Sequence, residues 1–319
     1  MSELVVDDTS LKSPQHTRLD ESFLYSLEPD ELQFFQANTG ITDPSQIKQH
    51  ILAIQAEAFE IFPYPCIQFF MFTKLKVTRY PIYAHVLEHG RTHPGAIFLE
   101  MACCFGNDAR KAALDGYPVE NIVATDLRRD FWDLGYKLFK DDPTSFPVPF
   151  LEGDIFSTQL LDLESPRLTE RPNLSDLKSL TGLLGHVSTI HASAFFHLFS
   201  QGKQNLLYRH SLLTQTTLED QRKLAERSVA LLNVQPGSTI FGSHNGAPDA
   251  GIYTGLGGPD QDMFCHSPES WKALWIELFG ERKIDVTATL EDSEIRRNLV
   301  GIAPPGKKKH ALIWSIVVL

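Results

Sequence analysis

Short apolar runs alternate with amphipathic segments from about residue 95 to residue 319. Seven of the apolar runs have the length and composition of buried strands. They lie at 95–102, 121–127, 147–156, 185–193, 237–246, 283–290 and 310–319. Helical patterns separate them at 107–116, 130–139, 218–232 and 268–280, and the segment 174–184 is also amphipathic.

This alternation predicts the fold class. Strands joined through helices need crossover connections, so they run parallel in a doubly wound sheet. The last two strands are separated only by a loop and should pair antiparallel. The sequence therefore predicts an α/β protein with a seven-stranded, doubly wound sheet whose last strand is antiparallel.

The chain before residue 95 shows no strand-like alternation. Its apolar residues fit helices at 27–40, 43–62, 66–77 and 79–90. The change of pattern predicts two domains, with residues 1–94 as an N-terminal helical cap or substrate lid and residues 95–319 as the ligand-binding domain. Residues 1 to about 17 are polar and should be loosely held.

Composition and charge exclude several classes of partner. The 319 residues are 42% hydrophobic and carry a formal net charge of -11, which argues against nucleic acid because phosphate binding needs a basic surface. The one basic run, 307–309, follows Pro-Pro-Gly and is expected to be a solvated turn. No apolar stretch reaches the roughly 18 residues of a membrane span. The acidic N-terminus lacks a signal peptide's apolar region, so we expect a cytoplasmic protein. A homodimer is compatible with the sequence, which does not require one.

Cysteine and histidine spacing gives no sign of a metal site. The four cysteines lack C-x-x-C spacing, so neither a disulfide framework nor a zinc site is expected. In the C-terminal half, no histidine pair has i, i+4 spacing on a clear helix. Those histidines are His191, His197, His210, His244 and His266.

The first strand, its turn and the helix that follows form the usual cradle for a nucleotide-like cofactor. The turn contains one glycine, Gly106, where a dinucleotide-binding turn contains three. Glu100 ends the first strand and Asp126 ends the second, where an acid can accept both ribose hydroxyls. Asp154, flanked by Ile155 and Phe156, can hold an adenine edge. A pyrophosphate needs close backbone amides and several glycines, so the turn favours S-adenosylmethionine over NAD.

These residues resemble class I S-adenosylmethionine-dependent methyltransferases. The family turn is acid-x-Gly-x-Gly-x-Gly, and here it is Glu100-Met-Ala102-Cys-Cys104-Phe-Gly106, with two glycines replaced. More narrowly, the stretches 190–201, 235–246 and 264–275 resemble fungal secondary-metabolite methyltransferases that methylate carboxyl groups of meroterpenoids.

The resemblance implies a set of cofactor-binding residues. Glu100 would lie near the methionine part, Asp126 would bind the ribose, and Asp154 and Ile155 would bind the adenine. His191 and Ala192 would face the sulfonium. The full set is Glu100, Ala102, Cys103, Cys104, Gly106, Asp126, Leu127, Asp154, Ile155, Phe156 and Ala192.

The candidates for catalysis and substrate binding rest on position. His191 and His244 end strands at the expected catalytic rim; a hydroxyl acceptor would need one of them as general base, whereas a carboxylate would need only orientation. Candidates for an apolar substrate pocket are Phe69, Phe72, Tyr80, His197 and Trp271. Each has an ordinary structural alternative, because aromatic residues at helical spacing usually pack in a core and Trp271 shares a helix face with Trp275. Cys103 and Cys104 are expected to be small turn residues, and His210 a structural histidine.

The predicted function is methyl transfer from S-adenosylmethionine to an apolar small molecule of secondary metabolism. The resemblance favours O-methylation of a carboxylate on a terpenoid or meroterpenoid. One alternative is an enzyme of the same fold that binds the cofactor but catalyses a cyclisation or rearrangement. Another is a cofactor-binding protein without catalysis, and a NAD-dependent reductase is disfavoured by the missing glycines.

Overall fold

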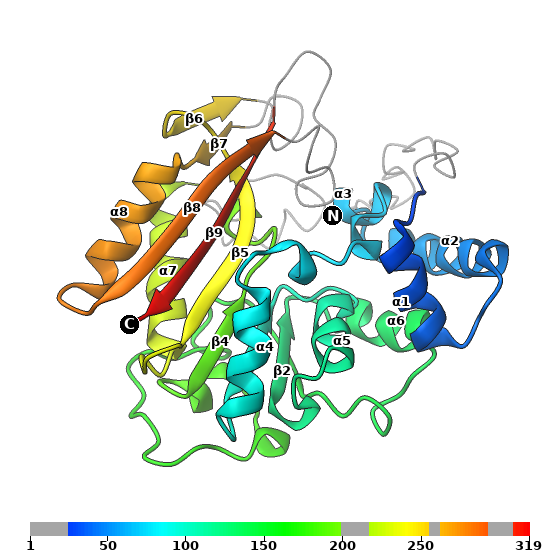
Figure 1. The fold of residues 1–319 in the computed structure, drawn as a ribbon, viewed down its shortest axis with the longest axis horizontal. Coiled ribbons are helices and arrows are strands. Elements are labelled where there is room, and N and C mark those ends of the chain that lie inside the picture. Colours follow the sequence, from blue (N-terminus) through cyan, green and yellow to red (C-terminus); the bar gives the residue numbers. More distant parts are fainter. Residues whose placement is uncertain (1–24, 199–216, 255–261, 293–308) are drawn as a thin grey trace, which may run out of the picture.

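A computed structural model describes residues 25–198, 217–254, 262–292 and 309–319. Its main sheet contains β1 (Ile97–Met101), β2 (Ile122–Asp126), β3 (Phe150–Glu152), β4 (Val187–His191), β5 (Thr239–Gly246), β8 (Ile284–Asp292) and β9 (His310–Val318). The strand order is β3-β2-β1-β4-β5-β9-β8 (Figure 1). All pairs among β1 to β5 are parallel, and β9 is antiparallel to both of its neighbours. The predicted fold class and antiparallel last strand are confirmed.

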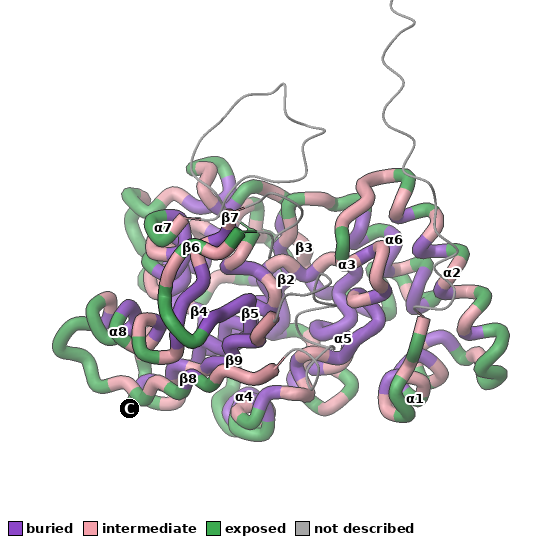
Figure 2. Tube along the Cα trace, turned by 90° about the horizontal axis from the view of Figure 1, so that it is seen from above, coloured by how far each residue is buried: buried purple, intermediate pink, exposed green. Residues whose placement is uncertain are grey.

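Helices cover both faces of this sheet (Figure 1). On one face, α4 (Tyr83–Thr92) and α5 (Asn107–Leu114) pack on Phe98, Ile122 and Phe241. On the other, α7 (Leu218–Leu231) and α8 (Pro268–Phe279) pack on the alternate residues of the same strands. This alternation follows from the pleat, which sends successive side chains to opposite faces. The central strands β1, β4 and β5 are therefore buried along their whole length, as Figure 2 shows, whereas the edge strand β8 is largely not.

The first helices pack beside the sheet, at the opposite end of the molecule from α8 (Figure 2). α1 (Pro29–Thr39) and α2 (Pro44–Ile61) contact α6 (Arg129–Phe139), which follows β2. Apolar residues of all three helices form one cluster with Phe105 of the turn after β1. A buried ion pair between Glu31 and Lys74, 2.9 Å long, ties α1 to the chain that leads towards the sheet.

The aromatic segment that leads to Tyr80 does not form the helix predicted at 66–77. It contains only α3 (Pro65–Gln68) and the 3-10 turns η2 (Met71–Thr73) and η3 (Val77–Arg79). Phe70 has φ 55°, a left-handed conformation that ends a helix, and Tyr80 is extended. The near-continuous apolar run lacks the 3.6-residue period of a helix that covers one face, so side chains from this segment enter different clusters.

Three further features add to or differ from what the sequence predicts. The amphipathic segment 174–184 forms the 3-10 turns η5 (Leu174–Asp176) and η6 (Leu180–Leu183). The short strands β6 (Gly251–Thr254) and β7 (Asp262–Cys265) form a hairpin that the pattern did not predict. Lys309 is half-buried, and burial lowers its pKa to about 8, so it does not belong to a solvated turn. Lys307, Lys308, His210 and residues 1–17 lie outside the described residues. Among the described helices, none is both long and apolar enough to cross a membrane.

Candidate active site

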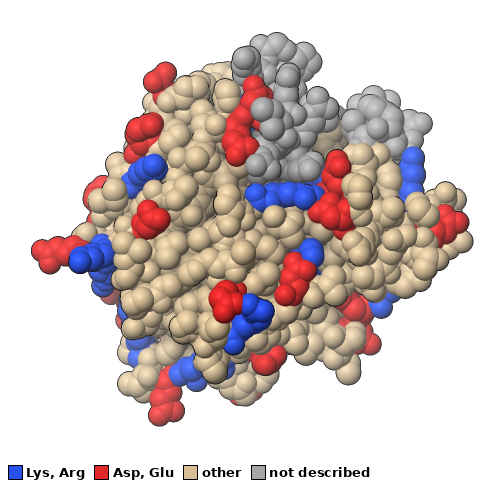
Figure 3. Space-filling view, viewed as in Figure 1, with Lys and Arg blue, Asp and Glu red and all other residues tan. Residues whose placement is uncertain are grey.

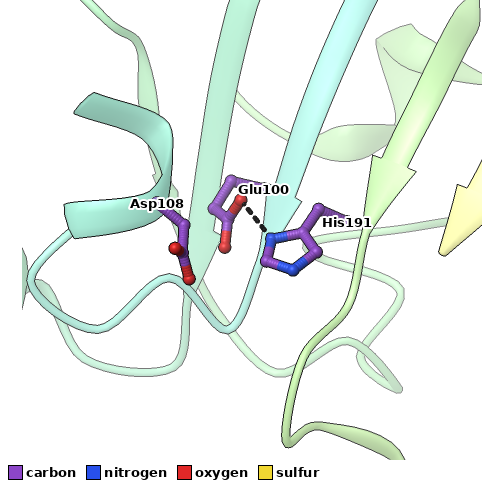
Figure 4. A group of neighbouring side chains, drawn as sticks. All are labelled: Glu100, Asp108 and His191. Atoms are coloured by element: carbon purple, nitrogen blue, oxygen red, sulfur yellow. Dashed lines mark hydrogen bonds and ion pairs between the residues drawn. The ribbon is translucent and has the colours of Figure 1, made fainter. Parts of the chain in front are cut away.

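The candidate site lies where the direction of strand order reverses. The chain runs β1, β2, β3 towards one edge of the sheet and then places β4 on the other side of β1. Ligands of doubly wound sheets bind beyond the carboxyl ends of the strands at this point. Glu100 of β1 and His191 of β4 are cross-strand partners there, and the Glu100 Oε2 lies 2.8 Å from the His191 Nδ1 (Figure 4).

Asp108, in the first turn of α5, completes a buried group with this pair. One ligand atom from each of Glu100, Asp108 and His191 lies within 4.8 Å of the other two (Figure 4). These residue types can bind a divalent metal ion. However, Glu100 already bonds His191, and the Asp108 Oδ1 accepts from the Val77 N–H at 3.0 Å, so both carboxylates have partners within the chain.

Burial controls the charge of this group. It raises the pKa of Glu100 well above its ordinary value and that of Asp108 to about 6. It also lowers the pKa of His191 to about 4, with Asp108 opposing that shift and Lys76 adding to it. These directions favour an uncharged Glu100–His191 pair, in which the Nε2 of His191 carries a hydrogen. This Nε2 is buried and has no hydrogen-bond partner in the described part of the chain.

The turn after β1 has the backbone of a glycine-rich turn without the glycines. Ala102, Cys104 and Gly106 all have positive φ, at 53°, 50° and 72°. Only Gly106 lacks room for a side chain, because a Cβ there would lie 2.5 Å from Trp132. Ala102 and Cys104 adopt a left-handed conformation, which is less favourable by roughly 1–2 kcal/mol for a residue that has a Cβ. The left-handed positions are thus the three positions that are glycines in the family turn.

Asp126, at the end of β2, lies against this turn. Its carboxylate accepts from the Cys104 N–H at 2.8 Å and from the Arg128 N–H at 3.2 Å. Burial raises its pKa, although both backbone bonds act in the opposite direction. The side chain is half-buried, so it supports the turn and still has contact with solvent.

The predicted adenine-binding residues follow the next strand end. Asp126 and Glu152 are partners in the β2–β3 register, which brings Asp154 to the same edge as Asp126. Asp154 is exposed, and its Oδ1 accepts from the Phe156 N–H at 2.9 Å. Leu127 is 56% exposed and Ile155 is buried. No described residue covers most of the Leu127 side chain.

The two candidate catalytic histidines point to opposite faces of the sheet. His191 packs on Phe241 and Tyr80, with ring centroids 4.8 and 5.5 Å away. His244 packs on Trp271 at 4.5 Å, and its Nδ1 accepts from the Trp314 Nε1–H at 2.9 Å. Because an indole nitrogen only donates, the neutral His244 ring carries its hydrogen on Nε2. Burial lowers its pKa well below the ordinary value, so its Nε2 is a donor and not a base.

The predicted substrate residues lie in three places instead of one pocket. The Tyr80 hydroxyl lies 2.5 Å from the Ser193 Oγ and 2.8 Å from the Ser243 Oγ, beside His191. Phe72 packs on Phe105 in the apolar cluster that includes α1 and α2. Phe69, three residues earlier in the sequence, is half-buried. Trp271 is buried on the opposite face of the sheet, where its ring packs edge-on against that of Phe196. His197 follows Phe196 in η7 (Phe196–Leu198), where burial lowers its pKa to about 3, and Ala192 is buried after β4.

Sequence reasoning missed four residues of this region: Lys76, Asp108, Ser193 and Ser243. Asp108 follows Gly106 by two residues, so its place in the first helical turn was a usable signal. Lys76 and the serines gave no local signal, because their neighbours in the site are distant in sequence.

Comparisons with known proteins match both parts of the chain. Residues 21–73 match a family described as the meroterpenoid methyltransferase N-terminal domain. The Asnovolin E/Chermesin D methyltransferase nvfJ of Aspergillus novofumigatus is 32% identical over 233 residues, which are 73% of this chain and 70% of that protein. The O-methyltransferase phiE of a fungal species is 28% identical over 275 residues (85% and 79%). The methyltransferase trt5 of Aspergillus terreus is 28% identical over 300 residues (91% and 93%).

Solved structures were also compared. The N-terminal domain of EvdMO1, with S-adenosylhomocysteine bound, has a TM-score of 0.44 and 12% identity and covers 84% of this chain and 96% of that one. The glycopeptide N-methyltransferase MtfA, in complex with S-adenosylmethionine, has a TM-score of 0.39 and 12% identity (74% and 93%).

Proposed function

Because the chain belongs to the family of fungal secondary-metabolite methyltransferases, we propose that it transfers a methyl group from S-adenosylmethionine to an oxygen of an apolar small molecule. The acceptor we propose is a carboxylate on a terpenoid or meroterpenoid, and the product is a methyl ester. The observation that carries this proposal is the hydrogen bond between the Glu100 Oε2 and the His191 Nδ1 at the switch point of the sheet.

The residues of the site fit this cofactor. Its ammonium and sulfonium are positive, and the site presents the carboxyl groups of Asp108 and Asp126, whose charged forms would repel a pyrophosphate. The left-handed turn also matches, since Ala102 and Cys104 reproduce the backbone of a glycine-rich loop but leave less room than glycines. We place the ribose at Asp126 and the adenine between Leu127, Asp154 and Ile155.

His191 suits a carboxylate acceptor better than a hydroxyl. When bound, S-adenosylmethionine supplies an electrophilic methyl group, and an acceptor oxygen displaces it from the sulfonium in line. A carboxylate is already ionised at neutral pH and needs no base. The Nε2–H of His191 can orient such an oxygen but cannot remove a proton while the pair is uncharged. Most of the rate enhancement would then come from alignment in a dry site.

A titration and a product analysis test the proposal. Isothermal calorimetry should show that the purified protein binds S-adenosylmethionine and S-adenosylhomocysteine but not NADH. Incubation with terpenoid acids and S-adenosylmethionine should then give a product heavier by one methylene, and alkali should cleave it, because esters hydrolyse and ethers do not. A methylated product that is stable to alkali would mean that the acceptor is a hydroxyl group and not a carboxylate. A product of unchanged mass would favour the rearrangement, and failure to bind S-adenosylhomocysteine would refute the proposal.

A further inference from the structure

Three hydrogen bonds fasten residues 74–80 across the candidate site. The Lys74 carbonyl accepts from the Asn107 Nδ2 at 2.8 Å, and the Val77 N–H donates to the Asp108 Oδ1 at 3.0 Å. Tyr80 then reaches Ser193 beyond β4. The segment is thus attached first to the start of α5 and then to the chain after β4. Residues 75–79 are therefore held over the gap between these two elements.

Of the three cations in this segment, two are used in contacts with α1. Lys74 forms the buried pair with Glu31, and Arg79 pairs with Asp30 at 2.8 Å. Lys76 makes no ion pair in the described part of the chain, and it is half-buried. It stands next to Val77, whose N–H donates to Asp108, so its backbone lies beside the buried group.

The charge of Lys76 acts on all three members of the buried group. Burial is the first cause of each shift, and the Lys76 ammonium then lowers the pKa of Glu100, of Asp108 and of His191. The Val77 N–H donates to Asp108, and ligand atoms of Glu100, Asp108 and His191 lie within 4.8 Å of one another, so the neighbouring Lys76 is close to this group. The site therefore combines two carboxyl groups with one ammonium.

This combination matches an α-amino acid. Such a group has an ammonium and a carboxylate on one carbon atom, so its receptor needs acids and a base a few ångströms apart. The methionine part of S-adenosylmethionine is the α-amino acid of the proposed cofactor, and its adenosine part carries no charge. An acceptor carboxylate alone would bind Lys76 and leave Asp108 without a cation to bind.

We propose that Lys76 binds the α-carboxylate of the cofactor's methionine part, while Glu100 and Asp108 face its ammonium. The N-terminal segment then completes the cofactor site and is more than a lid over the substrate. This inference rests on the proposed function, because it assumes that S-adenosylmethionine binds at the end of β1.

Three ligands that differ in their charged groups show which of these groups the site recognises. S-adenosylhomocysteine has both charged groups, its decarboxylated analogue S-adenosyl-3-thiopropylamine has only the ammonium, and 5′-methylthioadenosine has neither. Calorimetric titrations would use wild-type protein, Lys76→Met, Lys76→Arg and the exposed control Lys178→Met. Lys76→Met should lower the affinity for S-adenosylhomocysteine about tenfold or more, the scale of a lost hydrogen bond to a charged group. The affinity for the decarboxylated analogue and for 5′-methylthioadenosine should not fall. Lys76→Arg should keep most of the affinity, and Lys178→Met all of it.

The outcomes separate this inference from the function on which it rests. Unchanged S-adenosylhomocysteine affinity in Lys76→Met overturns it, and would leave an acceptor carboxylate as the partner of Lys76. An equal loss for all three ligands also overturns it, because the substitution would then act through the fold of the segment. Thermal unfolding of each variant identifies that case. If wild-type protein binds no S-adenosylhomocysteine, the proposed function itself fails.

Discussion

At the scale of single residues, the turn after β1 has the backbone conformation of a glycine-rich turn although it contains only one glycine. Ala102 and Cys104 adopt left-handed conformations that glycine adopts without strain. The fold therefore stores strain next to the proposed cofactor, as functional sites often do. The sequence showed which glycines are missing but not that their conformation persists, because that conformation is imposed by contacts such as the Cys104 N–H to Asp126 bond.

The strain can be measured by restoring a glycine. Ala102→Gly should raise the free energy of unfolding by about 0.5–1 kcal/mol, because relief of the left-handed Cβ exceeds the entropy that glycine loses on folding. Ala113→Gly in α5 is the matched control and should lower it by about 1 kcal/mol. Urea unfolding of both variants checks this. Destabilisation by Ala102→Gly would show that the methyl contact with the core outweighs the strain.

A second substitution tests the proposed ribose contact. Asp126→Ala should weaken S-adenosylhomocysteine binding by about 1–3 kcal/mol, since it removes a charged acceptor and frees the Cys104 N–H. Calorimetry measures the change. Asp162→Ala, which removes an acid from a loop outside the site, is the control and should bind normally. Equal affinity in both variants would remove Asp126 from the cofactor site.

At the scale of elements, the sequence predicted the strands well and the N-terminal segment poorly. Each of the seven strands has a local cause, an apolar or alternating run between turn residues. The segment 66–80 has no such cause, because Tyr80 and Val77 are placed by partners after β4, on β5 and on α5. The same limit applies to the site. Glu100, Asp126 and His191 were found from strand ends, whereas Lys76 depends on tertiary contacts that no local pattern shows.

One buried ion pair fixes the helix that begins at the turn. Arg110 of α5 is 2% exposed, forms a two-pronged contact with Asp141 and donates to the Phe105 carbonyl at 2.8 Å. Arg110→Met should destabilise the protein by about 3 kcal/mol, because it leaves the half-buried Asp141 and the Phe105 carbonyl unpaired. Arg129→Met removes an exposed cation 3.8 Å from Glu152 and should cost at most about 1 kcal/mol. Denaturant unfolding compares the two, and equal effects would contradict the structural role of Arg110.

At the scale of the whole molecule, titratable groups are divided between surface and interior. On the face shown in Figure 3, acidic and basic side chains are scattered among uncharged residues. Inside, burial lowers the pKa of five histidines and raises that of three carboxyl groups. The histidines are His89, His191, His197, His244 and His266, and the carboxyl groups are Glu100, Asp108 and Asp126. These two sets respond to pH in opposite directions.

Stability should therefore rise with pH between about 4.5 and 6.5. A histidine with a lowered folded pKa contributes stability that is lost as pH falls from its unfolded value, about 6.5, to its folded value, about 4 for His191 and His266. A carboxyl group with a raised folded pKa loses stability as pH rises, as for Asp108 up to about 6. Five histidines against three carboxyl groups leave a net uptake of at most about two protons on unfolding.

Urea unfolding at several pH values gives the slope. His266→Gln should reduce it by up to about one proton, because burial lowers the pKa of His266 to about 4. A flat or falling profile between pH 4.5 and 6.5 would mean that the carboxyl groups dominate.

The position of β9 also has a consequence for biosynthesis. β9 lies between β5 and β8, and β8 pairs with no other described strand. While the ribosome adds the residues of β8 and β9, β5 has no partner on the side that β9 later occupies, and it presents an unpaired edge. Such edges are templates for pairing with other chains. The nascent protein therefore has a period, ended only by the arrival of β9, in which chaperones or aggregation compete for the open edge of β5.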